Sequence, residues 1–394
     1  MRKWGLKLGS IPYKLLCRML GLFVKKQHRA LVISNVKIED NAISMANFLA
    51  AHYSLEVDLM LPARDMAFVK PFLDSRIHLY PSPRHMCLDW TSFKRLSRAK
   101  YVFLTYQFLY AKASRHQQYI NLWHGLTYKK IQRLRPYDGI LVQADYTVAG
   151  SEMTREMNAA IFGVPKEQVL ISGLPRNDQM LRSRDQANRI QKKLNLDSYS
   201  RVLIWMPTYR RSNATNSTAV RKQASALFGV EDFALHRLNR ILEENNAVCL
   251  LKTHHVMEVE EEGKTFDRVR LIDDAWLRRH EVLLYEFLAC TDALISDYSS
   301  VMIDYMLLDR PIFCLATDVE HYQRTQGLCF SPYSDWVPSA LYQTQDAFFE
   351  AVEVFLRTGI DQWQAKRRRL RTAFFLHQDA HSARRVAEAV LDGD

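Results

Sequence analysis

Several strands that we predict in this sequence end directly before residues that could take part in chemistry. The clearest case is the strand 119–122, which leads into Trp123, His124 and Gly125. A histidine titrates near neutral pH and can accept a proton from a hydroxyl nucleophile, and a glycine lets the backbone turn close to a ligand. His124 is therefore a candidate general base. The competing interpretation is a histidine whose ring is satisfied by backbone hydrogen bonds.

Cationic side chains follow further predicted strands, and they favour an anionic substrate such as a pyrophosphate. They are Lys252 and His254 after the strand 247–251, Arg176 after the strand 168–171, and Arg210, with Pro207 and Thr208, after the strand 202–205. Arginine in particular forms paired hydrogen bonds with phosphate oxygens. In α/β folds, ligands bind at the carboxyl ends of the strands. The repetition of this pattern along the chain predicts a site for phosphate groups.

A predicted helix begins at Ser299 and Ser300, soon after the strand 293–296. Hydroxyl groups and backbone N–H groups at the start of a helix bind anions. Asp304 lies four residues after Ser300 and therefore on the same face of the helix. An ordinary helix cap is the competing interpretation for the two serines. The sequence contains no Walker-type glycine loop and no Gly-x-Ser-x-Gly, and no Asp-x-Asp follows a predicted strand, so we expect neither a metal ion nor another cofactor.

The elements that must position these residues alternate between buried strands and helices. This alternation predicts an α/β fold with two doubly wound, Rossmann-like domains that face a central cleft. It is interrupted in the charged, weakly patterned segment 179–200, which is typical of an interdomain connection. We therefore expect an N-terminal domain at 29–178 and a C-terminal domain with the last helices at 201–394.

The chain of 394 residues carries 54 basic and 43 acidic side chains, which gives a net charge of +11. Such an excess favours polyanionic partners. The basic residues are not combined with clustered aromatic side chains in a recognised nucleic-acid-binding module, so we expect no nucleic acid partner. The six cysteines are scattered without metal-ligand spacing, which indicates a reducing, cytosolic environment.

The N-terminal segment is strongly basic, because nine basic residues precede the first acidic residue, Glu39. Between Pro12 and Lys26, apolar residues recur with helical spacing, which predicts a basic amphipathic helix within residues 1–28. Such a helix suits the surface of an anionic membrane. The competing interpretation is a helix packed on its own domain with its lysines in water. No apolar stretch approaches the ~20 residues that a transmembrane helix needs.

The motifs, taken in order, resemble those of the CDP-glycerol glycerophosphotransferases, which build teichoic acids and related capsular polymers. The matching segments are Trp123-His124-Gly125, Gly173 to Asp178, Pro207 to Arg210, Lys252 to His254, Ser296 to Ser300 with Asp304, and Asp379 to Val386. The resemblance implies a GT-B fold and peripheral attachment to the cytoplasmic face of the cell membrane. It also implies transfer of glycerol phosphate, or a related polyol phosphate, from a CDP-activated donor to a hydroxyl of a lipid-linked acceptor, with release of CMP.

The resemblance further implies that the N-terminal domain lies on the acceptor side and that the C-terminal domain binds the CDP-linked donor. It also implies roles for individual residues. His124 would be the general base, and His254 would contact the donor pyrophosphate as a second catalytic residue. The remaining donor-binding residues would be Trp123, Gly125, Arg176, Pro207, Thr208, Arg210, Lys252, Ser299, Ser300 and Asp304.

The sequence departs from the family pattern at three places near these motifs. It has Leu126-Thr127 where Thr-Pro is usual, Gln326-Gly327 where Arg-Gly is usual, and His255 where proline is common. These departures leave the donor open between CDP-glycerol, CDP-ribitol and another activated alditol or sugar phosphate. The alternative enzyme is a GT-B glycosyltransferase that uses a nucleotide sugar for cell-surface polysaccharide synthesis.

Overall fold

The computed structural model of the chain separates into two compact units. Unit 1 comprises Met1–Gly125, Ile131–Gln179 and Phe374–Asp394, and unit 2 comprises Leu126–Lys130 and Met180–Ala373. The residues that the structure describes are 15, 19, 27–34, 38–82, 90–106, 112, 116–135, 141–208, 233–252 and 266–391.

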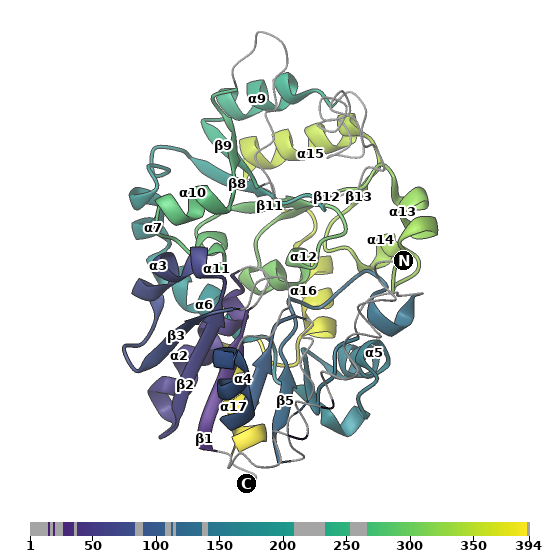
Figure 1. Ribbon diagram of the computed structural model, residues 1–394. Helices are drawn as coiled ribbons and strands as arrows, with labels where there is room; N and C mark the ends of the chain where they lie inside the picture. The colour runs from purple at the N-terminus through teal and green to yellow at the C-terminus, as the bar shows by residue number, and fades with distance from the viewer. Residues whose placement is uncertain are drawn as a thin grey trace, which may run out of the picture. The chain divides into compact units, whose positions relative to one another are not determined.

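Unit 1 contains a seven-stranded parallel sheet in the order β3-β2-β1-β4-β5-β6-β7 (Figure 1). Its strands are β1 (Gln27–Ile33), β2 (Glu56–Leu61), β3 (Ile77–Pro81), β4 (Ala99–Leu104), β5 (Gln118–Asn121), β6 (Tyr146–Ala149) and β7 (Val169–Ile171). Its helices are α2 (Asp40–His52), α3 (Met66–Val69), α4 (Trp90–Arg98), α5 (Glu152–Phe162) and α17 (Ser382–Leu391), with short 3₁₀ turns η1 (Ala63–Asp65), η2 (Lys70–Phe72), η4 (Gln132–Leu134) and η5 (Lys166–Gln168). Helix α6 (Pro175–Ser183) begins in unit 1 and ends in unit 2.

Unit 2 contains a six-stranded parallel sheet in the order β10-β9-β8-β11-β12-β13. Its strands are β8 (Arg201–Trp205), β9 (Ala247–Lys252), β10 (Val269–Ile272), β11 (Ala293–Ser296), β12 (Ile312–Leu315) and β13 (Leu341–Tyr342). Its helices are α7 (Ala187–Lys193), α9 (Leu235–Glu244), α10 (Asp274–Arg279), α11 (Leu284–Leu288), α12 (Val301–Tyr305), α13 (Val319–Thr325), α14 (Tyr333–Trp336), α15 (Gln345–Thr358) and α16 (Gln364–Phe374), with η6 (Arg184–Gln186) and η7 (Met306–Leu308).

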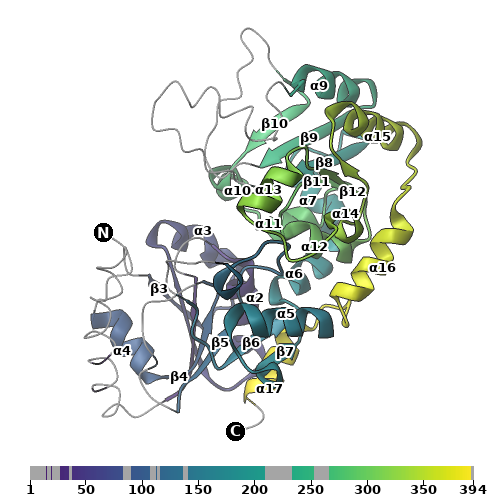
Figure 2. The same cartoon turned by 90° about the vertical axis from the view of Figure 1, so that its right-hand side faces the viewer.

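Helices α9 and α15 lie side by side in unit 2 and cover one face of its sheet (Figure 2). The core beneath them is aromatic, with Phe233 lying 5.1 Å from the Trp205 ring and 5.2 Å from the Phe349 ring between centroids. The strands are apolar along their length because the faces of a parallel sheet are covered by helices. This packing holds the carboxyl ends of β8, β9 and β11 in fixed positions.

Both sheets reverse their strand order next to their first strand. In unit 1, β1 lies between β2 and β4, and in unit 2, β8 lies between β9 and β11. This order is that of the Rossmann fold, in which ligands bind where the order reverses. The predicted fold class of two doubly wound, Rossmann-like domains is confirmed.

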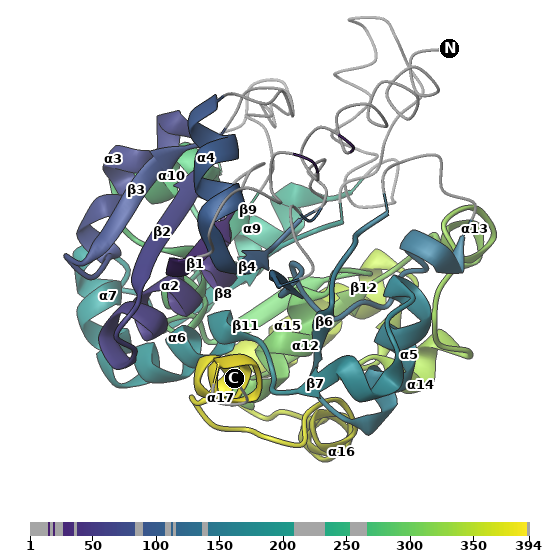
Figure 3. The same cartoon turned by 60° about the horizontal axis from the view of Figure 1, so that its bottom comes forward.

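The C-terminal helix α17 belongs to unit 1, whereas we expected all of 201–394 to form one domain. It packs on α2 and faces the viewer in Figure 3. The physical reason is that the Asp178 carboxylate accepts hydrogen bonds from the backbone N–H groups of Ser382 and Ala383, at 2.8 Å each. Periodicity predicts the helix but not the sheet to which the chain returns.

The segment 179–200 is also more structured than an interdomain connection, because it contains η6 and α7 and lies mostly in unit 2. Gln191 on α7 donates a hydrogen bond to the Cys290 carbonyl at 2.7 Å. The predicted helix of residues 1–28 lies outside the described residues, apart from Leu15, Met19 and the first two residues of β1. In the part of the chain that the structure describes, no helix has the length and apolar character needed to cross a membrane.

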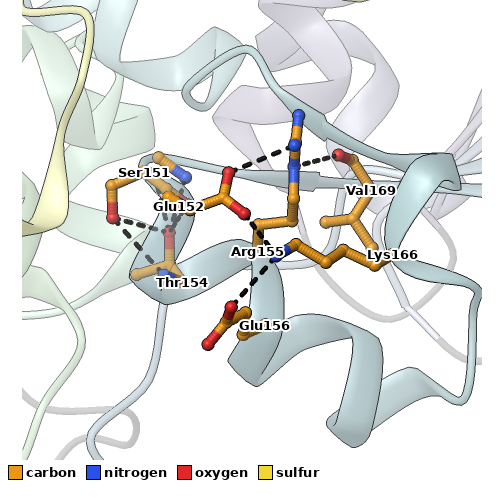
Figure 4. A network of polar contacts seen from close by, with 8 residues as sticks. Ser151, Glu152, Thr154, Arg155, Glu156, Lys166 and Val169 are labelled. Atoms are coloured by element: carbon orange, nitrogen blue, oxygen red, sulfur yellow. Dashed lines mark hydrogen bonds and ion pairs between the residues drawn. The ribbon is translucent and has the colours of Figure 1, made fainter.

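The start of α5 shows how local polar contacts define a helix in this fold (Figure 4). Ser151 and Thr154 form a reciprocal capping box, in which each side chain accepts a hydrogen bond from the other residue's backbone N–H. Lys166 contacts Glu152 at 2.6 Å, and Arg155 donates to the Val169 carbonyl at 3.1 Å. These bonds join α5 to β7, the strand that leads to Arg176.

Candidate active site

The segment after β5 turns sharply and carries the predicted general base. Trp123 has a φ of 51° and Gly125 a φ of 129°, both in the region that favours glycine. The Trp123 N–H donates to the side-chain oxygen of Asn121 at 3.0 Å. A tryptophan holds such a conformation only where surrounding bonds maintain it.

Two side chains from other elements of unit 1 supply those bonds. The side-chain amide of Asn41, on α2, donates to the Trp123 carbonyl at 3.0 Å. The Arg176 guanidinium, on α6, donates to the His124 carbonyl at 2.8 Å. Asn41 and Arg176 are in turn joined, because the Arg176 N–H donates to Asn41 Oδ1 at 2.9 Å. Asn41 and Arg176 are both buried. Together they hold the carbonyl groups of Trp123 and His124, the two residues at the centre of this turn.

The ring of His124 has a defined orientation. Its Nδ1 lies 3.3 Å from the Thr105 carbonyl oxygen at the end of β4. Because a carbonyl oxygen only accepts hydrogen bonds, Nδ1 carries the hydrogen in this contact, and Nε2 of the neutral ring carries the lone pair. This is the tautomer in which Nε2 can accept a proton from a hydroxyl group.

Aromatic rings flank His124. The Trp123 ring stacks on the imidazole with 4.1 Å between centroids, and the Tyr106 ring stacks at 5.5 Å. Aromatic faces attract cations, so these rings also favour the imidazolium that forms when the base takes a proton. The structure thus brings Trp123, His124, Gly125 and Arg176 together in unit 1.

In unit 2, Asp297 joins the loops that follow β8 and β11. Its Oδ1 accepts hydrogen bonds from the N–H groups of Thr208 at 2.8 Å and Tyr298 at 2.6 Å. The two strands are neighbours in the sheet and meet where its order reverses. Pro207, Thr208, Ser299 and Ser300 are therefore gathered at the position where a Rossmann-like domain binds its ligand.

Two predicted donor-binding residues of unit 2 are engaged in internal contacts. Asp304 on α12 is fully buried and accepts a hydrogen bond from the Tyr285 hydroxyl of α11 at 2.7 Å. Lys252 is buried at the end of β9, and its ammonium lies 2.8 Å from the Asp274 carboxylate. Burial of a charged group requires such a partner. Both residues therefore hold neighbouring elements of unit 2 together, whatever further contacts a donor makes.

Two predicted residues, Arg210 and His254, lie outside the described residues. The structure also places Asn41 and Asp297 in the site. Asp297 belongs to the motif Ser296 to Ser300, in which the sequence assigned it no role. Asn41 lies in the first turn of a helix, where a pattern of cations and hydroxyls at strand ends gives no signal. Asp297 directly follows β11, so its position alone was a usable signal.

The segment Leu126–Lys130, which follows the histidine motif, packs as part of unit 2. Lys129 pairs with Leu328 in an antiparallel bridge, and the side chain of Gln326 donates to the Lys130 carbonyl at 3.3 Å. Two of the places where this sequence departs from the family pattern therefore lie on segments that pair with each other.

The sequence itself matches a known family over most of its length. Residues 32–392 match the profile of the CDP-Glycerol:Poly(glycerophosphate) glycerophosphotransferase family. The chain is 25% identical over 297 residues to a teichoic acid glycerol-phosphate transferase of Staphylococcus aureus, which covers 69% of this chain and 71% of that protein. It is 24% identical over 325 residues to a teichoic acid glycerol-phosphate primase of Bacillus spizizenii, which covers 77% of this chain and 78% of that protein.

A longer relative and a solved structure complete the comparison. The chain is 27% identical over 276 residues to the teichoic acid ribitol-phosphate polymerase TarL of Staphylococcus aureus, and the match covers 66% of this chain and 46% of that protein. This chain thus spans about half of that polymerase. The structure of the wall teichoic acid polymerase TagF superposes with a TM-score of 0.75 at 19% identity, covering 100% of this chain and 97% of that one, which supports the fold. The chain therefore belongs to the CDP-glycerol:poly(glycerophosphate) glycerophosphotransferase family of enzymes.

Proposed function

We propose that this enzyme transfers glycerol phosphate, or a related polyol phosphate, from a CDP-activated donor to a hydroxyl group of a lipid-linked acceptor in the synthesis of a teichoic-acid-like or capsular polymer. The observation that carries the proposal is the orientation of His124, whose Nδ1 lies 3.3 Å from the Thr105 carbonyl oxygen. The family match supplies the reaction class.

In this reaction the acceptor oxygen attacks the phosphorus atom that carries the polyol. A phosphodiester bond forms to the acceptor, the bond from that phosphorus to the bridging oxygen breaks, and CMP leaves with the bond's electron pair. His124 accepts the acceptor's hydroxyl proton at Nε2. Phosphoryl transfer depends mainly on positioning and charge stabilisation, so a base with a fixed orientation and a site for the donor phosphates are the central requirements.

The donor phosphates are assigned to the strand ends of unit 2. Pro207 and Thr208 would line the nucleotide pocket, with Ser299 and Ser300 beside them through Asp297. His254 would contact the pyrophosphate. The family resemblance gives the further donor-contact residues as Arg210, Lys252, Asp304, Trp123, Gly125 and Arg176. No metal ion or cofactor is required by this scheme, because cationic side chains take the role of neutralising the phosphates.

Because the proposed acceptor is linked to a membrane lipid, we place the enzyme at the cytoplasmic face of the cell membrane. Residues 1–28 would attach it there as a peripheral membrane protein. Nine basic residues before Glu39 support attraction to anionic lipids. Leu15 and Met19 lie one helical turn apart and are 59% and 56% exposed, as expected for an apolar stripe that can enter a lipid interface. We expect no nucleic acid partner.

The proposal is tested with purified enzyme, lipid-linked acceptor in membranes, and a panel of CDP-glycerol, CDP-ribitol and nucleotide sugars. CMP release with a new phosphodiester in the product is expected for a CDP-alditol and should be absent in His124→Ala. Release of a nucleotide from a nucleotide sugar, with a new glycosidic bond, would instead establish the alternative, a GT-B glycosyltransferase. Relatives named for glycerol phosphate and for ribitol phosphate are both similar to this chain. The panel therefore includes both CDP-alditols, and the rates of CMP release distinguish them.

A further inference from the structure

We propose that Asn41 is a positioning residue for the general base, and this inference rests on the proposed role of His124. Asn41 lies in the first turn of α2, directly after the loop that leaves β1, and its side chain is fully buried. It touches the backbone of two distant segments, at Trp123 and at Arg176, which lie 82 and 135 residues further along the chain.

The two contacts use both ends of the side-chain amide. Nδ2 donates to the Trp123 carbonyl at 3.0 Å, and Oδ1 accepts from the Arg176 N–H at 2.9 Å. A carboxylate accepts but cannot donate, and an alkyl group does neither. A side chain that both donates and accepts, as this amide does, is therefore required if both backbone groups are to be satisfied away from water.

The bond to Trp123 acts on the orientation of His124. Trp123 has a φ of 51°, a conformation that a tryptophan leaves when the bonds that hold it are lost. A change in the Trp123 backbone turns the next residue, and the imidazole then loses its 3.3 Å contact with the Thr105 carbonyl. That contact selects the tautomer with the lone pair on Nε2.

The hydrogen bond between Asn41 and the Arg176 backbone supports the His124 backbone through its carbonyl group. The Arg176 guanidinium holds the His124 carbonyl at 2.8 Å, and the backbone of Arg176 is itself held by Asn41. Loss of the Asn41 amide therefore releases both supports of the His124 backbone at once. We expect turnover to fall much further than donor affinity, because the base acts on the acceptor and Trp123 and Arg176 supply only some of the proposed donor contacts.

The chain offers a matched control on the same helix. The amide of Asn47 also joins two backbone groups, donating to the Phe72 carbonyl and accepting from the Asp74 N–H, at 2.8 Å each. These partners lie at the end of η2 and two residues after it, and not in the segment that follows β5. Asn47→Asp therefore removes the same kind of contact from α2 without touching the Trp123-His124 backbone.

The experiment compares Asn41→Asp, Asn41→Gln and Asn47→Asp with the wild type in the full chain. Turnover and the Michaelis constant for the CDP-linked donor are measured, together with ¹⁵N NMR of histidine-labelled protein, in which the His124 signal is identified by its absence in His124→Ala. We expect Asn41→Asp to lower kcat on the order of 10²-fold, as misplacement of a reacting group does, and to raise the donor KM by a much smaller factor. The His124 signal should change from the Nδ1–H form to a mixture of tautomers.

Asn41→Gln keeps the donor and the acceptor on a longer side chain, so it should retain more turnover than Asn41→Asp and more of the Nδ1–H form. Asn47→Asp should lower the melting temperature but leave kcat and the His124 tautomer unchanged. Unchanged kcat or an unchanged tautomer in a folded Asn41→Asp would overturn the proposal, as would an equal loss of kcat in Asn47→Asp. If Asn41→Asp does not fold, the decision rests on Asn41→Gln. Turnover and a His124 tautomer like those of the wild type would support the proposal. A kcat that is 10²-fold lower while the tautomer stays that of the wild type would overturn it.

The NMR measurement needs no substrate, so the two proposals can fail separately. If no CDP-alditol is used by the wild type, the proposed function is wrong. A tautomer change in Asn41→Asp would still establish that Asn41 orients His124.

Discussion

The chemistry proposed for His124 depends on contacts that its own residue type does not provide. An imidazole can be protonated on either nitrogen, and in this protein the Thr105 carbonyl selects Nδ1. The stacked ring of Trp123 restricts rotation of the imidazole. At the scale of the residue, a common side chain becomes a directed base because its hydrogen-bond partner and its ring neighbours are fixed.

Replacing His124 with alanine should reduce turnover by ~10² to 10⁴-fold, the range that general acid–base catalysis contributes. The donor affinity should change little, because the proton comes from the acceptor. The two quantities are measured by CMP release and by calorimetry with the CDP-linked donor. Near-wild-type turnover in a folded His124→Ala protein would remove the assignment. Asp178 and Asp304 would be weak alternatives as the general base. Both oxygens of Asp178 already accept backbone hydrogen bonds, and Asp304 is fully buried.

At the scale of the element, α17 shows how one carboxylate can attach a helix to a distant strand end. Asp178 lies in the first turn of α6, the helix that follows β7, and it accepts hydrogen bonds from the first two N–H groups of α17. Close packing accompanies these bonds, since a Cβ added at Gly173, where φ is 79°, would lie 2.6 Å from the Ser382 hydroxyl. The motifs 173–178 and 379–386 are therefore parts of one structural junction in unit 1.

Asp178→Ala should lower the free energy of unfolding by about 1–3 kcal/mol for each N–H group left without its acceptor in the buried junction. Urea unfolding of the full chain measures the effect. The control is Asp185→Ala, because Asp185 is exposed on η6 and should change stability by less than ~0.5 kcal/mol. Equal stabilities of the Asp178→Ala and Asp185→Ala variants would show that the junction contributes nothing.

The same junction predicts a dependence on pH. The side-chain hydrogen bond from Arg385 is the main cause that lowers the pKa of Asp379 from 3.8 to about 2. The charge of Arg385, the backbone N–H of His381 and the charge of His381 contribute less. Because the folded pKa lies below the ordinary value, the ionised group stabilises the fold above about pH 4, and this contribution is lost as the pH falls toward about 2. Asp379→Asn should therefore be less stable than the wild type at pH 6, and the two urea midpoints should converge as the pH falls. A difference that persists unchanged near pH 2 would contradict this account.

At the scale of the whole molecule, the chain crosses repeatedly between its two units. It enters unit 2 for five residues after Gly125, returns at Ile131, leaves again after Gln179 and comes back at Phe374. The sequence motifs are distributed between both units, with His124 and Arg176 in one and the serine pair in the other. The net charge of +11 is also a property of the whole molecule, and many of the basic residues behind it precede β1.

Removal of residues 1–26, which end directly before β1, should release the protein from anionic vesicles while its melting temperature stays the same. Each lysine or arginine near such a surface contributes on the order of 1 kcal/mol, so loss of this segment removes most of the attraction. Sedimentation with vesicles of anionic and of neutral lipid measures the effect. If the shortened chain still sediments with anionic vesicles, the attachment lies elsewhere.

The sequence by itself determined the alternation of strands and helices, the two Rossmann-like domains and the residues at most of the strand ends. These features are local, because the period of apolar residues and the residue that follows a strand can be read from neighbouring positions. Trp123, His124 and Gly125 were found in this way, and the structure places them directly after β5.

Only the tertiary structure decided which distant groups meet. The contacts of Asn41 with Trp123 and Arg176, the pairing of Lys252 with Asp274, and the return of α17 to unit 1 join residues from different elements. Hydrogen bonds of this kind depend on how sheets and helices pack, and no spacing along the chain specifies them. The sequence could therefore propose His124 as a base, whereas the groups that orient it come from α2, the end of β4 and α6, which only the fold brings beside the end of β5.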